Sequence, residues 1–227
     1  MYHEITVWTR GIIMDKEARD VANCLSQAAR RDGRQAIYIS DYVDSPDRTN
    51  CLVRKYARIS DTEIQDTLVY ENPRPDIIVL IEETLIKAVD YTRTTPPGEG
   101  VVVVNSKRDP MFLARFLPDL GKVKRLVVVD AVGDNPDRWL YKNLTGLGYD
   151  RLSTEGASEL AAVGSGISAP LLGATARATG CVSMESLEAV VADPAGARRA
   201  YEECQILEAD QLAEAVRAAT AHQVATN

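Results

Sequence analysis

The chain has 227 residues, a formal net charge of −7 and 45% hydrophobic residues, which predicts a single folded domain over residues 1–227. Its pI near 5.0 argues against nucleic-acid binding by a broadly basic surface. No apolar run approaches the ~20 residues of a membrane-spanning helix, and the first residues lack the features of a secretory signal. We therefore expect a cytoplasmic protein that binds neither nucleic acid nor membrane.

Cysteine and histidine are too sparse for the common metal sites and catalytic triads. No C-x-x-C pair occurs, and the four cysteines are far apart: Cys24, Cys51, Cys181 and Cys204. The two histidines, His3 and His222, lie near the ends. No G-x-S-x-G, H-E-x-x-H or P-loop motif is present. The sequence thus predicts reduced thiols, no metal site and no catalytic residue in this chain.

The first elements read as strand, helix, strand. Residues 5–8 (ITVW) are β-branched and aromatic, and residues 36–39 (AIYI) form a second apolar run. Between them, apolar residues at helical spacing indicate a buried helix face: Ala18, Val21, Ala22, Leu25, Ala28 and Ala29. Asp15 is a candidate N-cap or first-turn residue, and Gly33 a candidate C-cap.

Three further apolar runs, residues 77–81, 101–104 and 126–129, are typical of parallel strands covered on both faces. Residues 83–90 and 110–117 are expected to form short helices, and the prolines and glycine within residues 92–100 predict a loop. Residues 52–60 alternate like a half-buried strand, which fits an antiparallel edge strand.

After residue 156 the composition favours helices, with candidates at residues 169–179, 186–191 and 202–221. The predicted fold is therefore a three-layer α/β/α domain. It has a mostly parallel, doubly wound sheet, an antiparallel edge strand and a helical C-terminal extension from about residue 185 to 227.

The turn after the first strand, residues 9–14 (TRGIIM), is the expected place for phosphate binding, because helix N-terminal N–H groups point there. It contains Arg10 and one glycine, Gly11, instead of the G-x-G-x-x-G of dinucleotide folds. A tight turn with an apolar plug is the simpler interpretation. Nearby, Arg48 and Thr49 either hold an anionic ligand or belong to a solvated edge strand that carries Arg54, Lys55 and Arg58.

Asn105 ends a buried strand and is either a polar ligand contact at the sheet edge or a turn residue. The small residues of 164–174 indicate close helix packing. The pairs Glu82–Glu83 and Glu202–Glu203 read most simply as solvated helix faces. Taken alone, these residues favour a domain that binds an anion over one that performs chemistry.

Several of these pieces occur in one order. The chain has the turn of residues 9–14, then DRTN (47–50), RISD (58–61), PD with TL nine residues on (75–85), VN (104–105) and LGA (172–174). From about residue 5 to 191 it thereby resembles the gamma subunit, the coenzyme-A-binding domain, of thiamine-diphosphate-dependent 2-oxoacid:acceptor oxidoreductases.

The resemblance implies a non-catalytic subunit of a complex that oxidatively decarboxylates a 2-oxoacid. This chain would close the active site and line the coenzyme A channel. Thiamine diphosphate, Mg²⁺ and [4Fe–4S] clusters would lie on alpha, beta and delta (ferredoxin-like) partner subunits, with ferredoxin or NAD as electron acceptor. The residues carried over as contacts to coenzyme A or its channel are Arg10, Gly11, Arg48, Thr49, Asn50 and Asn105.

The sequence departs from the family pattern in the first turn, where Ile12, Ile13 and Met14 replace glycine and glutamine positions. Two alternatives stay open: a structural subunit of a coenzyme-A-independent relative of the oxalate-oxidising type, and a standalone nicotinamide-binding oxidoreductase. The sequence does not identify the 2-oxoacid (pyruvate, 2-oxoglutarate, branched-chain, phenylglyoxylate or oxalate), the electron acceptor or the stoichiometry.

Overall fold

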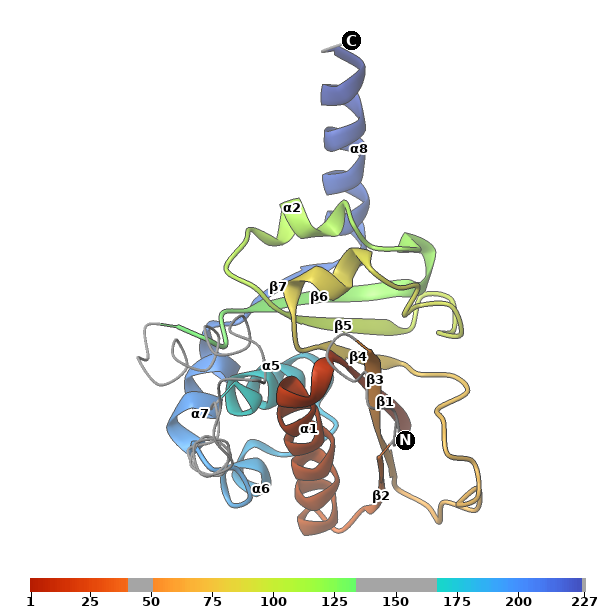
Figure 1. Ribbon diagram of the computed structural model, residues 1–227, viewed down its shortest axis with the longest axis vertical. Helices are drawn as coiled ribbons and strands as arrows, with labels where there is room; N and C mark the ends of the chain where they lie inside the picture. The colour runs from red at the N-terminus through yellow and green to blue at the C-terminus, as the bar shows by residue number, and fades with distance from the viewer. Residues whose placement is uncertain (41–50, 134–166, 226–227) are drawn as a thin grey trace.

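The computed structural model describes residues 1–40, 51–133 and 167–225, without the side chains of residues 11–14 and 218–225. Within this part of the chain, seven strands form one mixed sheet in the order β2-β3-β1-β4-β5-β6-β7 (Figure 1). The strands are β1 (Tyr2–Arg10), β2 (Gln35–Ser40), β3 (Leu52–Ser60), β4 (Ile77–Leu80), β5 (Gly100–Asn105), β6 (Val123–Val129) and β7 (Gln205–Glu208).

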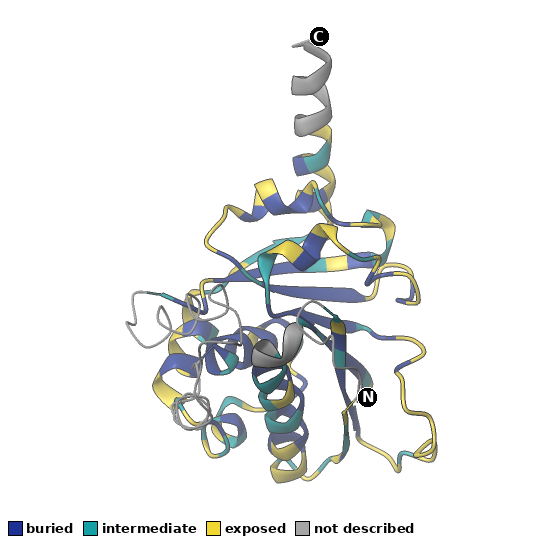
Figure 2. Ribbon diagram, viewed as in Figure 1, coloured by how far each residue is buried: buried dark blue, intermediate teal, exposed yellow. Residues whose placement is uncertain are grey.

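The centre of the sheet is parallel, as the apolar runs predict. β1 pairs with β4, β4 with β5 and β5 with β6, all in parallel. Every residue of β4 is buried, and Figure 2 shows the same for most of β5 and β6. Near-continuous Val, Ile and Leu runs suit these strands because both faces of the sheet are covered. The predicted α/β fold with a mostly parallel sheet is confirmed.

The antiparallel strand β3 lies inside the sheet, so its predicted place at the edge is wrong. It pairs with β1 on one side and β2 on the other, with Tyr2 opposite Ser60 and Arg10 opposite Leu52. β2 therefore takes the edge position next to it. Alternation alone did not reveal this, because the polar residues of β3 are covered by other polar groups and are themselves largely buried.

Helices cover both faces of the sheet (Figure 1). On one side, here called the α1 face, lie α1 (Gly11–Arg31), α5 (Ser168–Thr179), α6 (Met184–Glu188) and α7 (Pro194–Glu203). On the other, the α2 face, lie the 3-10 helices η1 (Glu83–Lys87) and η2 (Leu120–Lys122), and the α-helices α2 (Pro110–Ala114) and α8 (Ala209–Ala225). The predicted helices at residues 83–90 and 110–117 are thus present in shorter form.

The apolar stripe of α1 forms the core of the α1 face. Its six predicted residues, Ala18, Val21, Ala22, Leu25, Ala28 and Ala29, are all fully buried. The helix begins at Gly11, so Asp15 lies in its second turn and is not the N-cap. At the other end Asp32 is the C-cap, and Gly33 follows with a φ of +78° that glycine adopts without strain.

α5 and α7 approach each other unusually closely at Gly173. A Cβ atom built on this glycine would lie 1.9 Å from the carbonyl oxygen of Ala197 in α7. The small residues of this segment therefore serve close helix packing, as predicted for its described part.

The expected helix over residues 202–221 is confirmed only from residue 209 onward, where α8 begins. α7 ends at Glu203, and the four residues of β7 then add an antiparallel strand to β6 before α8 begins. A four-residue strand has too short a pattern to stand out against helical neighbours. Figure 1 shows α8 leaving the sheet and projecting from the rest of the chain.

Candidate functional site

Neighbouring strands β1 and β4 send the chain to opposite faces of the sheet. β1 leads into α1 on one face, and β4 leads into η1 on the other. In open α/β sheets the crevice at such a switch point, beyond the carboxyl ends of the strands, is the usual ligand site. Arg10 ends β1 here and Glu82 follows β4.

Arg10 and Glu82 form the charged part of this edge. Burial raises the pKa of Glu82 above its ordinary value, and the Arg10 guanidinium and backbone N–H oppose that rise. Arg10 is half-buried and forms no ion pair with the residues that the structure describes. It is also the N-cap of α1 and supplies no side-chain cap, so the first-turn N–H groups of this helix favour an anion.

Asn105 connects three strand ends at the same edge. Its Nδ2 donates to the carbonyl of Ile81 at 3.1 Å, and its Oδ1 accepts from the backbone N–H of Ala131 at 3.1 Å. The side-chain amide therefore holds the ends of β4, β5 and β6 in place. This geometry gives Asn105 a structural role at the edge, whatever else it contacts.

Beyond Asn105 the chain forms a compact network around Glu83. The hydroxyl of Ser106 donates to one carboxylate oxygen of Glu83 at 2.6 Å, and Nε of Arg108 donates to the other at 2.6 Å. Lys107 lies 3.4 Å from Asp130, which follows β6. The interpretation of Glu82 and Glu83 as solvated helix faces is therefore wrong, because both take part in contacts at the sheet edge.

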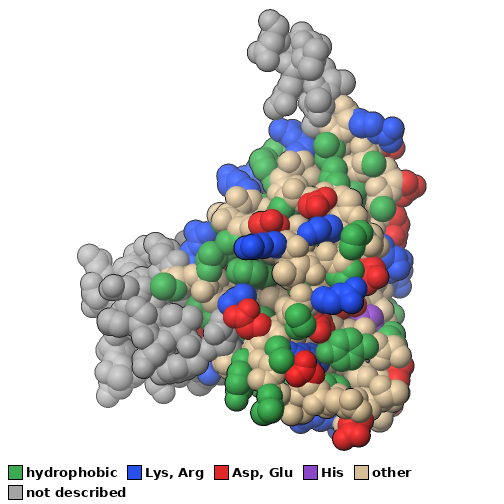
Figure 3. Space-filling view, turned by 90° about the vertical axis from the view of Figure 1, so that its right-hand side faces the viewer, with side chains coloured by type: hydrophobic (Ala, Val, Ile, Leu, Met, Phe, Trp, Pro, Cys, Tyr) green, Lys and Arg blue, Asp and Glu red, His purple; other side chains and the backbone are tan. Residues whose placement is uncertain are grey.

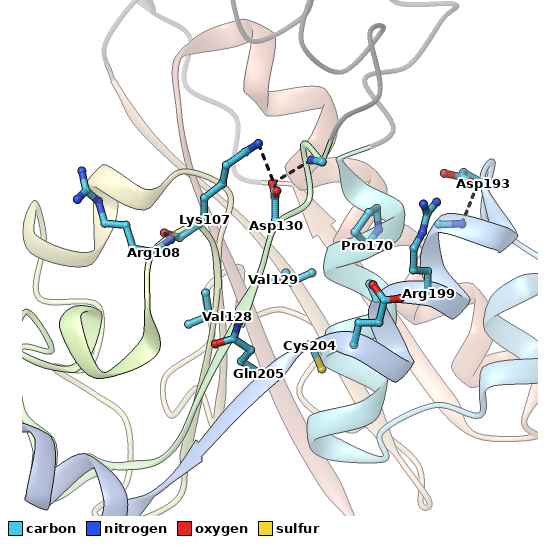
Figure 4. A pocket seen from close by; sticks show the side chains of 15 residues that line it. Lys107, Arg108, Val128, Val129, Asp130, Pro170, Asp193, Arg199, Cys204 and Gln205 are labelled. Carbon is cyan, nitrogen blue, oxygen red and sulfur yellow. Dashed lines mark hydrogen bonds and ion pairs between the residues drawn. The ribbon is translucent and has the colours of Figure 1, made fainter.

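A cavity of about 800 Å³ opens between these strand ends and α7. Figure 4 shows Lys107 and Asp130 on its β5–β6 side, and Arg199, Cys204 and Gln205 on the side of α7 and β7. Arg199 has no ion pair within the described part of the chain. The lining mixes cations and carboxylates with apolar and neutral polar groups, so it suits a ligand that carries both charged and neutral groups.

Of the predicted contact residues, three fall in the described part of the chain. Arg10 and Gly11 lie side by side at the end of β1 and the start of α1, and Asn105 ends β5. The parallel strands β1, β4 and β5 bring these positions to one edge of the sheet. Arg48, Thr49 and Asn50 lie outside the described residues.

Two buried charged contacts hold the first half of α1 beside this edge. Lys55 of β3, 3% exposed, lies 2.7 Å from a carboxylate oxygen of Asp15. Glu17, fully buried, accepts the backbone N–H of Ser168 at the start of α5, at 2.9 Å. Each links α1 to another element next to the candidate site.

Sequence reasoning missed both contacts, although a signal was present. Lys55 shares a strand face with the apolar residues Val53 and Ala57, and Glu17 lies four residues before Val21 on the apolar stripe of α1. A charged residue on an apolar face indicates a buried ion pair or cap. Arg58, also taken as part of a solvated strand, is fully buried.

Neither a metal centre nor a membrane span is found where the structure can be described. Among residues 1–40, 51–133 and 167–225, no three metal-ligating side chains gather in one place. Over those ranges, no helix is both long and apolar enough to cross a bilayer.

The sequence is similar to gamma subunits of 2-oxoacid oxidoreductases, although no family model matches it. The pyruvate/ketoisovalerate oxidoreductases common subunit gamma of Pyrococcus furiosus is 29% identical over 199 residues, which cover 82% of this chain and 90% of the relative. The pyruvate synthase subunit PorC of Thermotoga maritima is 27% identical over 75% of this chain and 72% of its own length. The resemblance stated from the sequence motifs is confirmed.

Solved structures show the same fold. The pyruvate oxidoreductase subunit PORC of Thermotoga maritima has a TM-score of 0.61 and 24% identity, covering 91% of this chain and 99% of its own. The keto/oxoacid ferredoxin oxidoreductase gamma subunit of Geobacter sulfurreducens has a TM-score of 0.57 and 18% identity, over 96% of this chain and 98% of its own. A 2-oxoglutarate:ferredoxin oxidoreductase from Magnetococcus marinus, solved with coenzyme A bound, matches with a TM-score of 0.55 and 13% identity over 96% of this chain but only 31% of its own.

Proposed function

We propose that this chain, a homologue of the gamma subunits of 2-oxoacid oxidoreductases, is itself the gamma subunit of a multi-subunit 2-oxoacid:acceptor oxidoreductase. The observation that supports this proposal most strongly is the similarity to named gamma subunits over 82% of the chain, together with a fold that matches theirs. The complex would oxidatively decarboxylate a 2-oxoacid in the cytoplasm and pass electrons to ferredoxin or NAD.

In this proposal the chain contributes no catalytic residue. The carboxyl edge of its sheet closes the reaction chamber and lines the channel for coenzyme A. Thiamine diphosphate, Mg²⁺ and [4Fe–4S] clusters belong to the alpha, beta and delta (ferredoxin-like) subunits. That division agrees with the scattered cysteines of this chain, which offer no cluster-binding spacing. We also propose that residues 1–227 act as one domain with a C-terminal extension from about residue 185.

The donor set at the edge fits the phosphates of coenzyme A. Arg10 offers a guanidinium without an ion-pair partner among the described residues, beside the uncapped first turn of α1. A guanidinium binds phosphate through two parallel hydrogen bonds, and helix N–H groups add to it. Arg48, Thr49 and Asn50, which precede β3 in the sequence, are the further contacts in this proposal. When bound, coenzyme A would accept the acyl group that decarboxylation leaves.

One observation favours the coenzyme-A-independent alternative. The amide of Asn105, one of the expected contacts, is already used to hold Ile81 and Ala131. In a relative that releases only carbon dioxide, this edge would close the active site without binding coenzyme A. The kinetic experiment described next distinguishes a coenzyme A contact from this purely structural role.

The test is steady-state kinetics of the assembled complex. Arg10→Ala and Arg48→Ala should each raise the KM for coenzyme A at least tenfold, with unchanged KM for the 2-oxoacid and unchanged iron content. Arg31→Ala is the matched control, because Arg31 lies at the opposite end of α1 and is exposed. If the KM for coenzyme A is unchanged in both variants, the proposed coenzyme A contact is refuted. The alternative of a subunit with a purely structural role then stands.

The subunit assignment itself is tested by co-purification. The chain should elute with a thiamine-diphosphate-binding subunit and a cysteine-rich, ferredoxin-like subunit. Purification without them, combined with saturable thermal stabilisation of the chain by NADH, would instead establish the standalone nicotinamide-binding oxidoreductase.

A further inference from the structure

Residues Asp61–Glu71, here called the acidic strap, lie where the outer layer of the fold has no helix. On the α2 face the helices η1, α2 and α8 pack over β4, β5 and β6. Over β1 and β3 the described structure has only the strap and the residues that follow it (Figure 1). This part of the sheet is covered by irregular backbone, and its outer side faces away from the core.

The acidic strap is held in one shape by the buried side chain of Arg58, which is 1% exposed. Its guanidinium donates to the carbonyls of Asp66 (2.6 Å), Val69 (2.7 Å) and Glu71 (2.7 Å), and to Oδ1 of Asn72 (3.0 Å). Asn72 in turn donates to a carbonyl of β1 at 2.8 Å. Irregular backbone fixed this firmly costs little further ordering when a partner binds.

The C-terminal part of the strap carries exposed apolar side chains. Leu68 is 80% exposed and Tyr70 is 72% exposed, with Val69 between them and Tyr2 of β1 also exposed. Figure 3, turned so that this side faces the viewer, shows hydrophobic side chains reaching the surface on the lower half of the face, among acidic and basic ones. Exposed aromatic side chains such as Tyr70, carried on an anchored backbone, are enriched among the residues that stabilise protein–protein interfaces.

The charge of the strap points to the kind of partner. It contains Asp61, Glu63, Asp66 and Glu71 and no lysine or arginine. Asp61 pairs with the N-terminal amine and with Arg34, and Glu71 pairs with Arg54, whereas Glu63 and Asp66 form no ion pair within the described chain. A second copy docked through this surface would bring like charges together, which disfavours it.

We propose that the acidic strap docks a different subunit of the oxidoreductase, one that presents lysine or arginine side chains around an apolar pocket for Leu68 and Tyr70. This inference rests on the proposed function, since it takes its partner from the same complex. Relatives named as a common subunit of pyruvate and ketoisovalerate oxidoreductases are consistent with it, because a shared subunit needs a preformed surface.

The experiment uses the full chain co-produced with the other subunits of the oxidoreductase, and measures the fraction of the chain that co-elutes with them. Leu68→Glu and Tyr70→Glu should each weaken association at least tenfold. Glu63→Lys/Asp66→Lys should also weaken it, and raising the salt concentration should weaken the wild type. Met111→Glu is the control, because Met111 is also an exposed apolar residue (38%) but lies on α2, away from the strap.

Thermal unfolding of each free chain checks that the exposed substitutions leave the fold intact. If the wild type assembles and the strap variants assemble equally well, the docking inference is wrong and the proposed function stands. If the wild type associates with none of these subunits, both are wrong. If the wild type instead forms a homodimer and Leu68→Glu dissociates it, the strap binds a second copy of this chain. The proposal that it binds a different subunit would then be wrong.

Discussion

Lys55 of β3 and Asp15 of α1 form an ion pair of 2.7 Å in which the lysine is almost completely buried. The pair crosses from the sheet to the helix that follows β1, just below the carboxyl edge of the sheet. It therefore fixes the direction in which α1 leaves the candidate site.

Asp15→Ala should destabilise the chain by about 3 kcal/mol, because it leaves the charge of Lys55 buried without this carboxylate. Urea unfolding measures the change. Asp20→Ala, which removes an exposed pair with Lys16 on the same helix, should cost less than about 0.5 kcal/mol. If the two substitutions lower the free energy of unfolding equally, the buried ion pair stabilises the chain no more than the pair of Lys16 and Asp20.

Gly173→Ala should destabilise the chain by about 3 kcal/mol, because the added Cβ meets a carbonyl of α7 that cannot yield without moving the helix. Thermal unfolding is the measurement. Gly33→Ala is the control, because a Cβ atom at this position would contact no other group. Its only cost, about 1 kcal/mol, is that alanine adopts the left-handed backbone conformation less readily than glycine. A Gly173→Ala protein as stable as the control would mean that α5 and α7 separate easily.

Arg58→Met should loosen the acidic strap and cost about 3 kcal/mol, because charge-assisted hydrogen bonds to its backbone are lost. Hydrogen exchange and limited proteolysis should show faster opening of residues 61–71. Arg54→Met, which removes an exposed ion pair with Glu71, should cost less than about 1 kcal/mol. Unchanged protection of the strap in Arg58→Met would contradict its assigned anchor.

Asn105→Ala should cost about 2 kcal/mol in the free chain, because the Ile81 carbonyl and the Ala131 N–H lose their side-chain partner. Urea unfolding of the isolated chain checks this. Lys107→Ala, which removes an exposed contact to Asp130, should cost under about 0.5 kcal/mol. If Asn105→Ala leaves stability unchanged, the residue is free to serve a ligand instead.

The carboxylate of Asp32 should make stability depend on acid pH. Burial opposes its ionisation, but hydrogen bonds from Ser183 and Ser186 prevail, so the pKa of Asp32 lies below its usual value. The folded state thus favours the ionised form. Its stabilisation is complete above the unfolded-state pKa of about 3.9 and is lost as the pH falls through the folded-state pKa.

Asp32→Asn should accordingly lower the urea midpoint at pH 7, and its difference from the wild type should shrink towards pH 3 and below. A difference that stays constant over this range would mean that the hydrogen bonds to Ser183 do not depend on the charge of Asp32.

Local pattern predicts the central elements well and their neighbours poorly. The runs at residues 77–81, 101–104 and 126–129 are long enough to specify buried strands, and the stripe of α1 specifies its buried face. Strand order depends on pairing between distant segments, which periodicity does not encode, so β3 was expected at the edge. The short β7 depends on the free side of β6 and carries no strong pattern of its own.

The candidate site was predicted by position more than by contacts. The switch-point rule placed Arg10 and Asn105 at one edge of the sheet, as the structure does. It did not reveal that the amide of Asn105 is engaged by backbone groups of two other segments, nor that Glu83 is bound by Ser106 and Arg108. Such contacts join residues far apart in the sequence, and only the folded chain brings them together.

The pairing of β7 with β6 has a consequence for synthesis on the ribosome. The outer side of β6, Val123–Val129, remains without its neighbour until Gln205–Glu208 has left the exit tunnel, long after the parallel centre could assemble. During that interval the nascent chain displays an open row of backbone donors and acceptors beside valine side chains, which can recruit other strands. Truncated chains that end before residue 205 should therefore aggregate during translation and engage chaperones for longer than the complete protein.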